Sequence, residues 1–223
     1  MCGRFSFAAS DRIIEDHFGI TPDKTGYKPR YNCAPSQKLA VISSELPTTF
    51  SYMKWGLIPY WAKDISIGNK LINAKAETIT EKPSFKQSFL FKRCLVPADG
   101  FYEWKKEKEK TPYRITMKDD SLFAMAGLWS RWHDAEGKII DSFAIITTEA
   151  NGLMQPIHHR MPVILEAQDY KTWLESSSTE ILLPLLKPYP DDQMKAFTVS
   201  KLVNSPANDF IEITETIIST LPL

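Results

Sequence analysis

Short runs of β-branched and aromatic residues fill the middle of the chain, and polar turn sequences separate them. Runs of this kind are typical of β-strands. The segments PADG, KDDS and DAEG supply the proline, glycine and aspartate residues that favour turns between them. The pattern predicts strands at residues 39–44, 49–57, 93–107, 112–117, 121–132, 138–148 and 194–200.

Helical patterns lie on both sides of this region. In residues 10–19, Ile14 and Phe18 are one turn apart, Ser10 is placed to cap the helix and Gly19 to end it. Residues 167–176 and 178–186 also have helical spacing. We therefore expect an α+β protein, with residues 1–223 forming one β-rich domain whose curled, barrel-like mixed sheet has helices packed outside it.

Composition narrows the class of protein. The chain has 27 basic and 27 acidic residues, so a DNA or RNA partner would require a local basic patch. Three cysteines without CxxC spacing argue against a disulfide framework and a zinc site, and indicate a reducing compartment. No secretory signal or membrane-length apolar run is present, so we expect a soluble, cytoplasmic protein without metal or cofactor.

The second residue, in MCGRF, is a cysteine. Removal of Met1 would leave Cys2 with a thiol and a free α-amine on adjacent carbons, a pair that no internal residue has. The alternative is a disordered chain start with an incidental cysteine. Gly3 and Arg4 favour the first interpretation slightly, because glycine lets another chain approach closely.

Three further stretches are more specific than a sheet core requires. YNCAPSQ at 31–37 reads as an ordinary turn when taken alone. MKWGLIPYWAKD at 53–64 is rich in aromatic residues, which either anchor the core or line a groove where bases stack. LINAKAET at 71–78 places Asn73 among small residues, with Lys75 two positions later.

An acidic residue, Glu103, lies within the aromatic run FYEW. Strand alternation places Phe101, Glu103 and Lys105 on one face and Tyr102 and Trp104 on the other. A carboxylate among rings is desolvated, which raises its pKa and suits acid–base chemistry. The alternative is a strand glutamate that faces water.

The segment PIHHRMPVIL places two histidines beside an arginine. His158 and His159 titrate near neutral pH, and Arg160 adds a permanent cation. The spacing of histidines and cysteines gives no metal-ligand pattern. KKEKEK at 105–110 is the single charge run, and we expect it to be the solvated tip of a hairpin.

Taken together, MCGRF, YNCAPSQ, WGLIPYWAKD, NAKAET, KRCLVPADGFYEWKK and HHRMPVIL resemble the ordered motifs of the SOS-response-associated peptidase (SRAP) family, also called abasic-site processing proteins. The motifs span residues 2–165. The resemblance implies the family fold and four active-site residues, namely Cys2, Asn73, Glu103 and His158. It also implies DNA contacts by Arg4, Trp55, Lys75, Trp104 and Arg160. Lys75 stands where the family commonly has arginine, so its phosphate contact should be weaker and less directional.

The resemblance implies covalent capture of abasic sites in single-stranded DNA through a thiazolidine on Cys2, which shields the lesion as a DNA–protein crosslink. Glu103 and His158 would move protons, and Asn73 would orient Cys2. An abasic-site lyase side reaction and autocatalytic removal of Met1 are further implications. The expected protein is a monomer of compact bacterial form, associated with the nucleoid and with DNA repair in the SOS response.

Two other functions fit part of the pattern. The first is an N-terminal-nucleophile peptidase that uses the Cys2 thiol on peptide carbonyls and needs no DNA groove. The second is a noncovalent module that binds single-stranded DNA, in which Cys2 is incidental. Loss of abasic-site protection in a Cys2→Ala variant would separate covalent capture from simple binding.

Overall fold

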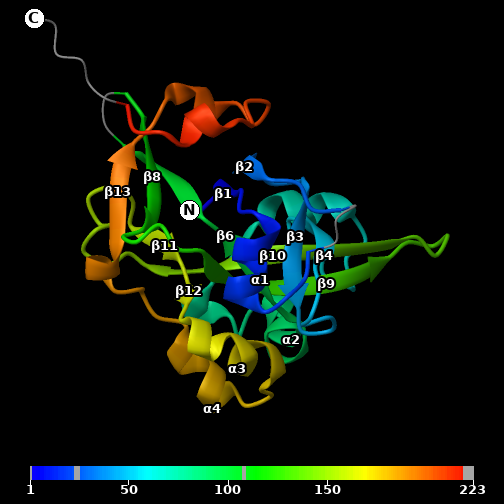
Figure 1. Cartoon of the computed structure of the whole chain (residues 1–223). Helices are drawn as coiled ribbons and strands as arrows, with labels where there is room; N and C mark the ends of the chain where they lie inside the picture. The colour runs from blue at the N-terminus through cyan, green and yellow to red at the C-terminus, as the bar shows by residue number, and fades with distance from the viewer. Residues whose placement is uncertain (1, 23–25, 107–108, 218–223) are drawn as a thin grey trace, which may run out of the picture.

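A closed barrel of five strands forms the centre of the computed structural model, which describes residues 2–22, 26–106 and 109–217 (Figure 1). In ring order the strands are β4 (Ser51–Trp55), β3 (Lys38–Ser43), β6 (Arg93–Ala98), β9 (Phe123–His133) and β10 (Ile139–Glu149). The ring closes because β10 pairs with β9 on one side and with β4 on the other. The β10–β4 pairing is parallel and the others are antiparallel. The predicted barrel-like mixed sheet and the α+β class are confirmed.

Three short strands extend the barrel sheet. They are β5 (Asn73–Lys75), which runs parallel to β10, β11 (Arg160–Pro162), which pairs with β10, and β12 (Ile164–Leu165), which pairs with β9. Each is too short for an alternating pattern to be visible in the sequence, so none was predicted. Two of them carry predicted site residues, Asn73 and Arg160, to the edge of the barrel.

A second, antiparallel sheet lies beside the barrel. Its strand order is β13 (Met194–Thr198), β8 (Thr111–Met117), β7 (Gly100–Lys105), β1 (Phe5–Phe7) and β2 (Arg30–Cys33). The predicted turn DAEG joins the β9–β10 hairpin. PADG and KDDS are instead places where the chain passes from one sheet to the other, between β6 and β7 and between β8 and β9.

The KKEKEK run lies between the paired strands β7 and β8, as expected for a hairpin. Residues 107 and 108 of that run lie outside the described residues, and residue 107 is the last of the predicted strand 93–107. The remaining predicted strands are present within a few residues of their expected limits.

Within the described residues, four α-helices pack around the sheets: α1 (Asp11–Phe18), α2 (Pro83–Phe91), α3 (Tyr170–Glu175) and α4 (Thr179–Leu182). Helix α1 ends at Gly19 as predicted, with φ of 67°, but the Ser10 side chain makes no capping bond. Helix α2 was not predicted, because its apolar residues are not confined to one face: Phe89 is buried and Phe91 is exposed. Among the described residues, no helix is long and apolar enough to cross a membrane.

Short segments of 3₁₀ helix lie between several of these elements. They are η1 (Ile65–Lys70), η2 (Ala76–Thr78), η3 (Ala167–Asp169), η4 (Leu183–Leu185), η5 (Asp191–Gln193), η6 (Lys201–Asn204) and η7 (Ile211–Thr214). In Figure 1, α3 and α4 lie at the lower end of the molecule, and the segment that contains η6 and η7 lies at the upper end.

Strand β7 separates two hydrophobic clusters, as its alternation predicted. Phe101 belongs to the large cluster that fills the barrel and the space between the sheets. Tyr102, from the opposite face, packs with Val199, Val203 and Ile213 of the C-terminal segment. Both faces of this strand are therefore covered, and a carboxylate on it is removed from water.

Two glycines allow the chain to return from β4 to β5. A Cβ atom on Gly56 would lie 2.6 Å from the carbonyl oxygen of Gly68, and one on Gly68 would lie 2.7 Å from that of Gly56. Gly56 also has a φ of 126°, which side chains other than glycine rarely adopt. This close approach brings the 3₁₀ turn η1 against the end of β4 and delivers Asn73 to the sheet.

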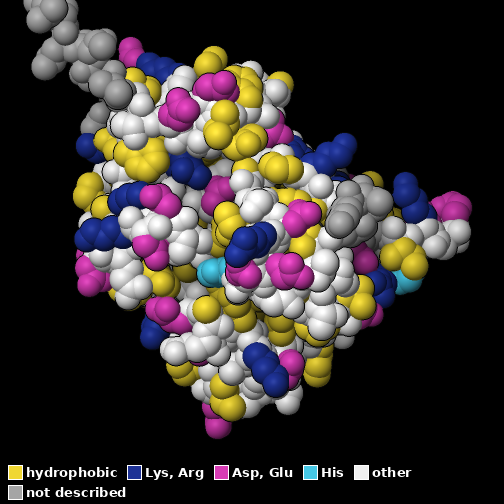
Figure 2. All heavy atoms as spheres, viewed as in Figure 1, with side chains coloured by type: hydrophobic (Ala, Val, Ile, Leu, Met, Phe, Trp, Pro, Cys, Tyr) yellow, Lys and Arg dark blue, Asp and Glu magenta, His cyan; other side chains and the backbone are white. Residues whose placement is uncertain are grey.

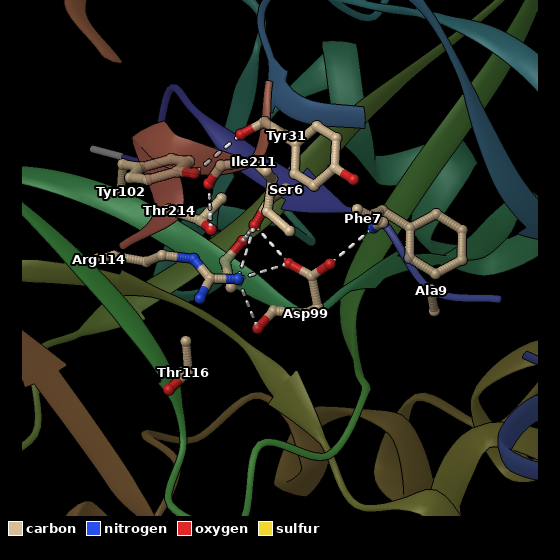
Figure 3. A network of polar contacts seen from close by, with 12 residues as sticks. Ser6, Phe7, Ala9, Tyr31, Asp99, Tyr102, Arg114, Thr116, Ile211 and Thr214 are labelled. Carbon is tan, nitrogen blue, oxygen red and sulfur yellow. Dashed lines mark hydrogen bonds and ion pairs between the residues drawn. The ribbon is translucent and has the colours of Figure 1, made fainter. Parts of the chain in front are cut away.

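The carboxylate of Asp99 holds strand β1 in place (Figure 3). It accepts hydrogen bonds from the Ser6 hydroxyl, from the backbone N–H of Ala8 at 2.6 Å and from Arg114 Nη2 at 2.8 Å. The backbone N–H of Asp99 in turn donates to the Ser6 carbonyl at 2.9 Å. Four contacts at the point where the chain changes sheets thus set the position of the N-terminal strand.

Replacing Asp99 should therefore destabilise the fold. We expect Asp99→Ala to lower the free energy of unfolding by about 3 kcal/mol, because Arg114, Ser6 and the Ala8 N–H lose a shared, partly buried acceptor. Urea unfolding followed by circular dichroism measures the change.

The matched control is Asp16→Ala, which removes an aspartate from the exposed pair with Arg12 on α1. Its cost should stay within about 0.5 kcal/mol. Equal effects of the two substitutions would contradict a clamping role for Asp99.

Candidate active site

The main chain of Cys2 is held between two sheets. Asn73 Nδ2, on β5, donates to the Cys2 carbonyl at 2.9 Å. Two residues later, the carbonyl of Arg4 accepts the backbone N–H of Tyr102, on β7, at 2.9 Å. The Cys2 side chain is fully buried. Met1 itself lies outside the described residues.

Asn73 reaches Cys2 because β5 lies parallel to β10, with Asn73 opposite Ile145. Its Nδ2 is used in the bond to the Cys2 carbonyl, and its Oδ1 is buried without a hydrogen-bond partner among the described residues. A buried acceptor without a partner is costly, so an N–H donor in this position would be strongly favoured. The carboxamide is thus able both to hold the Cys2 main chain and to accept from an amine next to it.

Glu103 is placed on β7 with only 3% of its surface exposed. Burial raises the pKa of its carboxyl group. Burial also raises the pKa of the Cys2 thiol, and the nearby negative charge of Glu103 raises it further. At neutral pH the thiol is therefore protonated, and the carboxylate beside it is a stronger base than an exposed glutamate.

His158 lies in the loop before β11. Its Nδ1 is 3.0 Å from the backbone N of Arg160, which donates to it, and its ring stacks on His159 with centroids 4.4 Å apart. Burial is the main cause of a lowered pKa for His158, and the neighbouring positive charge of Arg160 adds to it. The imidazole is therefore mostly neutral at physiological pH and able to accept or pass on a proton.

Arg160 is engaged by an acidic residue of the NAKAET motif. Its guanidinium donates to both carboxylate oxygens of Glu77, at 2.5 and 2.9 Å, and to the carbonyl of Thr147 at 2.6 Å. The fork-to-fork pairing lowers the pKa of Glu77. Lys75, from the same motif, is exposed. A phosphate could reach Lys75 directly, whereas at Arg160 it would have to replace Glu77.

A pocket of about 400 Å³ opens at the end of β7. Two of the predicted catalytic side chains line it, Glu103 and His158. The rest of its wall is formed by Trp104, Lys106, Lys110 and Asn204. The pocket combines an acid–base pair with an aromatic ring and two cations, which suits a polar, negatively charged substrate.

Two of the predicted DNA contacts, Trp55 and Arg4, have side chains that make contacts within the protein. Trp55 is fully buried, with its ring against Phe5 and Phe143 and its Nε1 bonded to the Ile72 carbonyl at 2.9 Å. It cannot stack on a base without leaving the core, and its alternation with the less buried Lys54 was a signal for this.

The exposed aromatic residues of that stretch are Tyr60 and Trp61, at 60% and 46% of their surface. Arg4 is half-buried, and its Nη1 donates to Asn32 Oδ1 at 2.7 Å and to the Val203 carbonyl at 2.6 Å. Its guanidinium is therefore used inside the protein, where it ties the N-terminal segment to the C-terminal one.

Three residues of the pocket were not among the predicted site residues: Lys106, Lys110 and Asn204. The two lysines belong to the KKEKEK run, which in sequence resembles a solvated tip. Asn204 belongs to the VNSPAND stretch of the C-terminal segment, which has no pattern that sets it apart from a loop. Only the pairing of β7 with β8, and the packing of the C-terminal segment on Tyr102, bring them to Glu103.

The surface and the titratable groups set further limits on the site. On the face shown in Figure 2, basic and acidic side chains are interspersed. Among the described residues, no group of three or more histidine, cysteine, aspartate or glutamate side chains could hold a metal ion.

Comparison with known proteins shows to which family the chain belongs. The SOS response associated peptidase (SRAP) model matches residues 1–206. Two Bacillus subtilis proteins, abasic site processing proteins YoqW and YoaM, are 48% and 49% identical to the chain over 96% of its length, and the matches cover 99% and 97% of theirs. Abasic site processing protein HMCES of Xenopus tropicalis is 31% identical over 89% of the chain and 69% of its own length.

A crystal structure of a Bacteroides thetaiotaomicron protein superposes with a TM-score of 0.85 at 33% identity, covering 93% of this chain and 97% of that one. Fold, motif order and sequence similarity agree along almost the whole length. The chain therefore belongs to the SOS response associated peptidase (SRAP) family.

Proposed function

We propose that this protein processes abasic sites in single-stranded DNA by forming a covalent bond between Cys2 and the lesion, once Met1 has been removed. The observation that carries the proposal is the placement of the Cys2 main chain against Asn73, with the buried Glu103 beside its thiol. Relatives of similar length are named abasic site processing proteins, which supports DNA lesions as the substrate class.

The chemistry begins with the amine. An abasic deoxyribose opens to an aldehyde, which the Cys2 α-amine attacks to give a carbinolamine and then, with loss of water, an imine. An α-amine has a pKa of about 7.7–8.0 against about 10.4 for lysine, so far more of it is unprotonated at neutral pH. The thiol then adds to the imine carbon, and its proton passes to the nitrogen to complete a five-membered thiazolidine ring.

The burial of the thiol favours this order of events. With its pKa raised by burial, the Cys2 sulfur is a protonated thiol rather than a free thiolate. Ring closure is intramolecular and needs only that a base take the thiol proton as the bond forms. An intramolecular step of this kind has an effective molarity of about 10⁵ M or more. Attack on a separate peptide carbonyl has no such advantage, which disfavours the alternative of a protein-cleaving peptidase.

Each neighbouring side chain has a defined role in this scheme. Glu103 takes a proton from the amine or thiol and returns it as the hydroxyl leaves. His158, across the pocket, helps to open the sugar and to protonate the departing oxygen. Asn73 orients the Cys2 backbone and accepts from the amine through Oδ1. Lys75 and the pocket lysines attract phosphates, and Trp104 offers a ring for a neighbouring base.

Two side reactions follow from the same groups. An imine acidifies the hydrogen on the adjacent sugar carbon, so Glu103 acting as a base would cause β-elimination and cut the strand. Autocatalytic removal of Met1 would use the same acid–base residues. A noncovalent single-strand-binding function remains the alternative if neither crosslink nor strand cleavage occurs.

The role of Cys2 is tested with single-stranded DNA that contains one abasic site. The processed wild-type protein should give a heat-stable crosslink that mass spectrometry locates as a thiazolidine on residue 2. Cys2→Ala and Cys2→Ser retain the α-amine, so they should give a stable crosslink only when borohydride is added to reduce the imine.

The matched control is Cys94→Ala, which removes another buried thiol, from β6, and should leave crosslinking intact. A heat-stable crosslink with Cys2→Ala in the absence of borohydride would exclude the thiazolidine.

The raised pKa of Glu103 predicts that a Glu103→Gln substitution has opposite effects on activity and on stability. Glu103→Gln should slow crosslinking by about 100-fold or more, because it removes the base. It should also stabilise the protein at neutral pH, because the wild-type carboxyl pays a desolvation cost when it ionises.

The difference in unfolding free energy between Glu103→Gln and wild type is measured against pH by urea unfolding. It should be constant at pH values below the ordinary glutamate pKa and should grow in favour of the variant as pH rises through the higher, folded-state pKa. A difference that shrinks with rising pH would show that the folded protein favours the ionised carboxyl.

The pairing of Arg160 with Glu77 predicts that Glu77 weakens DNA binding. Glu77→Gln should tighten the noncovalent binding of intact single-stranded DNA about three- to tenfold at low salt, because a phosphate no longer competes with a carboxylate for the guanidinium. Fluorescence anisotropy with a labelled oligonucleotide measures the affinity.

Glu45→Gln is the matched control, since Glu45 also pairs with an arginine and its side chain is similarly exposed, at 48% against 50% for Glu77. The Glu45→Gln variant should bind single-stranded DNA with the same affinity as wild type. Weaker binding by Glu77→Gln would mean that Glu77 is needed to hold Arg160 in a binding position.

A further inference from the structure

Residues 199–209, here called the C-terminal strap, are fastened to the start of the chain by buried polar contacts. Asn32 Nδ2, on β2, lies within hydrogen-bond distance of three strap carbonyls: Ser205 at 3.0 Å, Asn208 at 2.6 Å and Val203 at 3.3 Å. The Asn32 side chain is fully buried. One carboxamide thus fixes the path of the strap.

The other end of the strap is held by a carboxylate. Asp209 accepts the backbone N–H groups of Tyr31 and Asn32, at 2.6 and 2.9 Å, and pairs with Arg30. Arg4 adds a hydrogen bond to the Val203 carbonyl at 2.6 Å. Asn204 lies between Val203 and Ser205, whose carbonyls both accept from Asn32, so these contacts fix the backbone on either side of it.

Asn204 links the strap to the pocket. Its Oδ1 accepts a hydrogen bond from Trp104 Nε1 at 2.7 Å, and its side chain lines the same pocket as Glu103 and His158. Its Nδ2 donates no hydrogen bond to any residue that the structure describes, and the residue is exposed. The carboxamide therefore presents a donor to the pocket while its oxygen holds the indole.

We propose that Asn204 is a substrate-contacting residue, whose Nδ2 donates to a backbone phosphate oxygen next to the lesion while Oδ1 fixes the plane of Trp104. This inference rests on the proposed function of the site. A phosphate is the matching group, because the pocket wall beside Asn204 also carries the ammonium groups of Lys106 and Lys110. A base stacked on the held indole would place the adjoining phosphate within reach of both the lysines and the carboxamide.

Binding is measured separately from crosslinking. Single-stranded DNA with a tetrahydrofuran residue in place of the abasic sugar has no aldehyde, so it reports noncovalent affinity alone. Asn204→Ala should weaken the binding of this DNA about tenfold, because the variant loses a hydrogen bond to a charged group. A tenfold loss of affinity corresponds to about 1.4 kcal/mol. Asn204→Asp should weaken it more, although it retains the acceptor for Trp104, because a carboxylate repels the phosphate.

The order of the two variants separates contact with DNA from a purely structural role. If Asn204 only held Trp104, the aspartate variant would bind at least as well as the alanine variant. That order, or an Asn204→Ala affinity equal to wild type, would overturn the proposal. Gln168→Ala removes an exposed carboxamide beside α3, at the opposite end of the molecule in Figure 1, and should leave affinity unchanged.

A neutral phosphate analogue identifies the contact. A series of oligonucleotides carries one methylphosphonate each, at successive positions around the tetrahydrofuran residue. At the contacted phosphate, methylphosphonate and Asn204→Ala should together cost no more than either alone, and elsewhere their effects should add. Additive effects at every position would show that Asn204 acts without touching the backbone.

The outcome does not depend on whether the proposed chemistry is correct. Wild-type protein that binds the tetrahydrofuran DNA but forms no crosslink with a true abasic site would contradict covalent capture and leave the binding role of Asn204 intact. Normal crosslinking together with unchanged affinity in Asn204→Ala would support covalent capture and contradict the binding role of Asn204. Circular dichroism of both variants confirms that the strap substitutions leave the fold unaltered.

Discussion

The structure depends on the immobilisation of the first strand. Chain termini are usually mobile, and a nucleophile at the second residue would be of little use if it moved. Here β1 lies between β2 and β7, Asp99 clamps its middle, and Asn73 holds the Cys2 carbonyl. The barrel and the second sheet meet at Asp99, so the position of the N-terminus is tied to the packing of the two sheets against each other.

Burial of the site fits the proposed chemistry. The Cys2 thiol and the Glu103 carboxyl are both shielded from water, which raises both pKa values. The consequence is a protonated sulfur beside a strong base, which suits a reaction that starts at the α-amine and ends with ring closure. The same burial is a cost to stability, since an ionised carboxylate in the core is unfavourable. In the proposed mechanism, activity and stability thus make opposite demands on Glu103.

Residues near the start of the chain hold the C-terminal strap, which contributes Asn204 to the pocket. Arg4 directly precedes β1 and Asn32 lies on β2, and both bind the C-terminal strap that carries Asn204. Charges that the sequence offers for DNA are partly used inside the protein: Arg4 holds the strap, and Arg160 is paired with Glu77. Under the proposed function, phosphate binding therefore depends on the exposed lysines or on an exchange of partners at Arg160.

The sequence by itself determined the strands of the barrel, the helices with a clear apolar face, and the family motifs that contain Cys2, Asn73, Glu103 and His158, because these patterns are local. Which aromatic residues are exposed, which cations are already paired and which distant segment completes the pocket were decided only by the tertiary structure. Trp55 and Asn204 illustrate the difference. The exposure of a side chain and its partners depend on segments far away in the sequence, and no local pattern records where those segments pack.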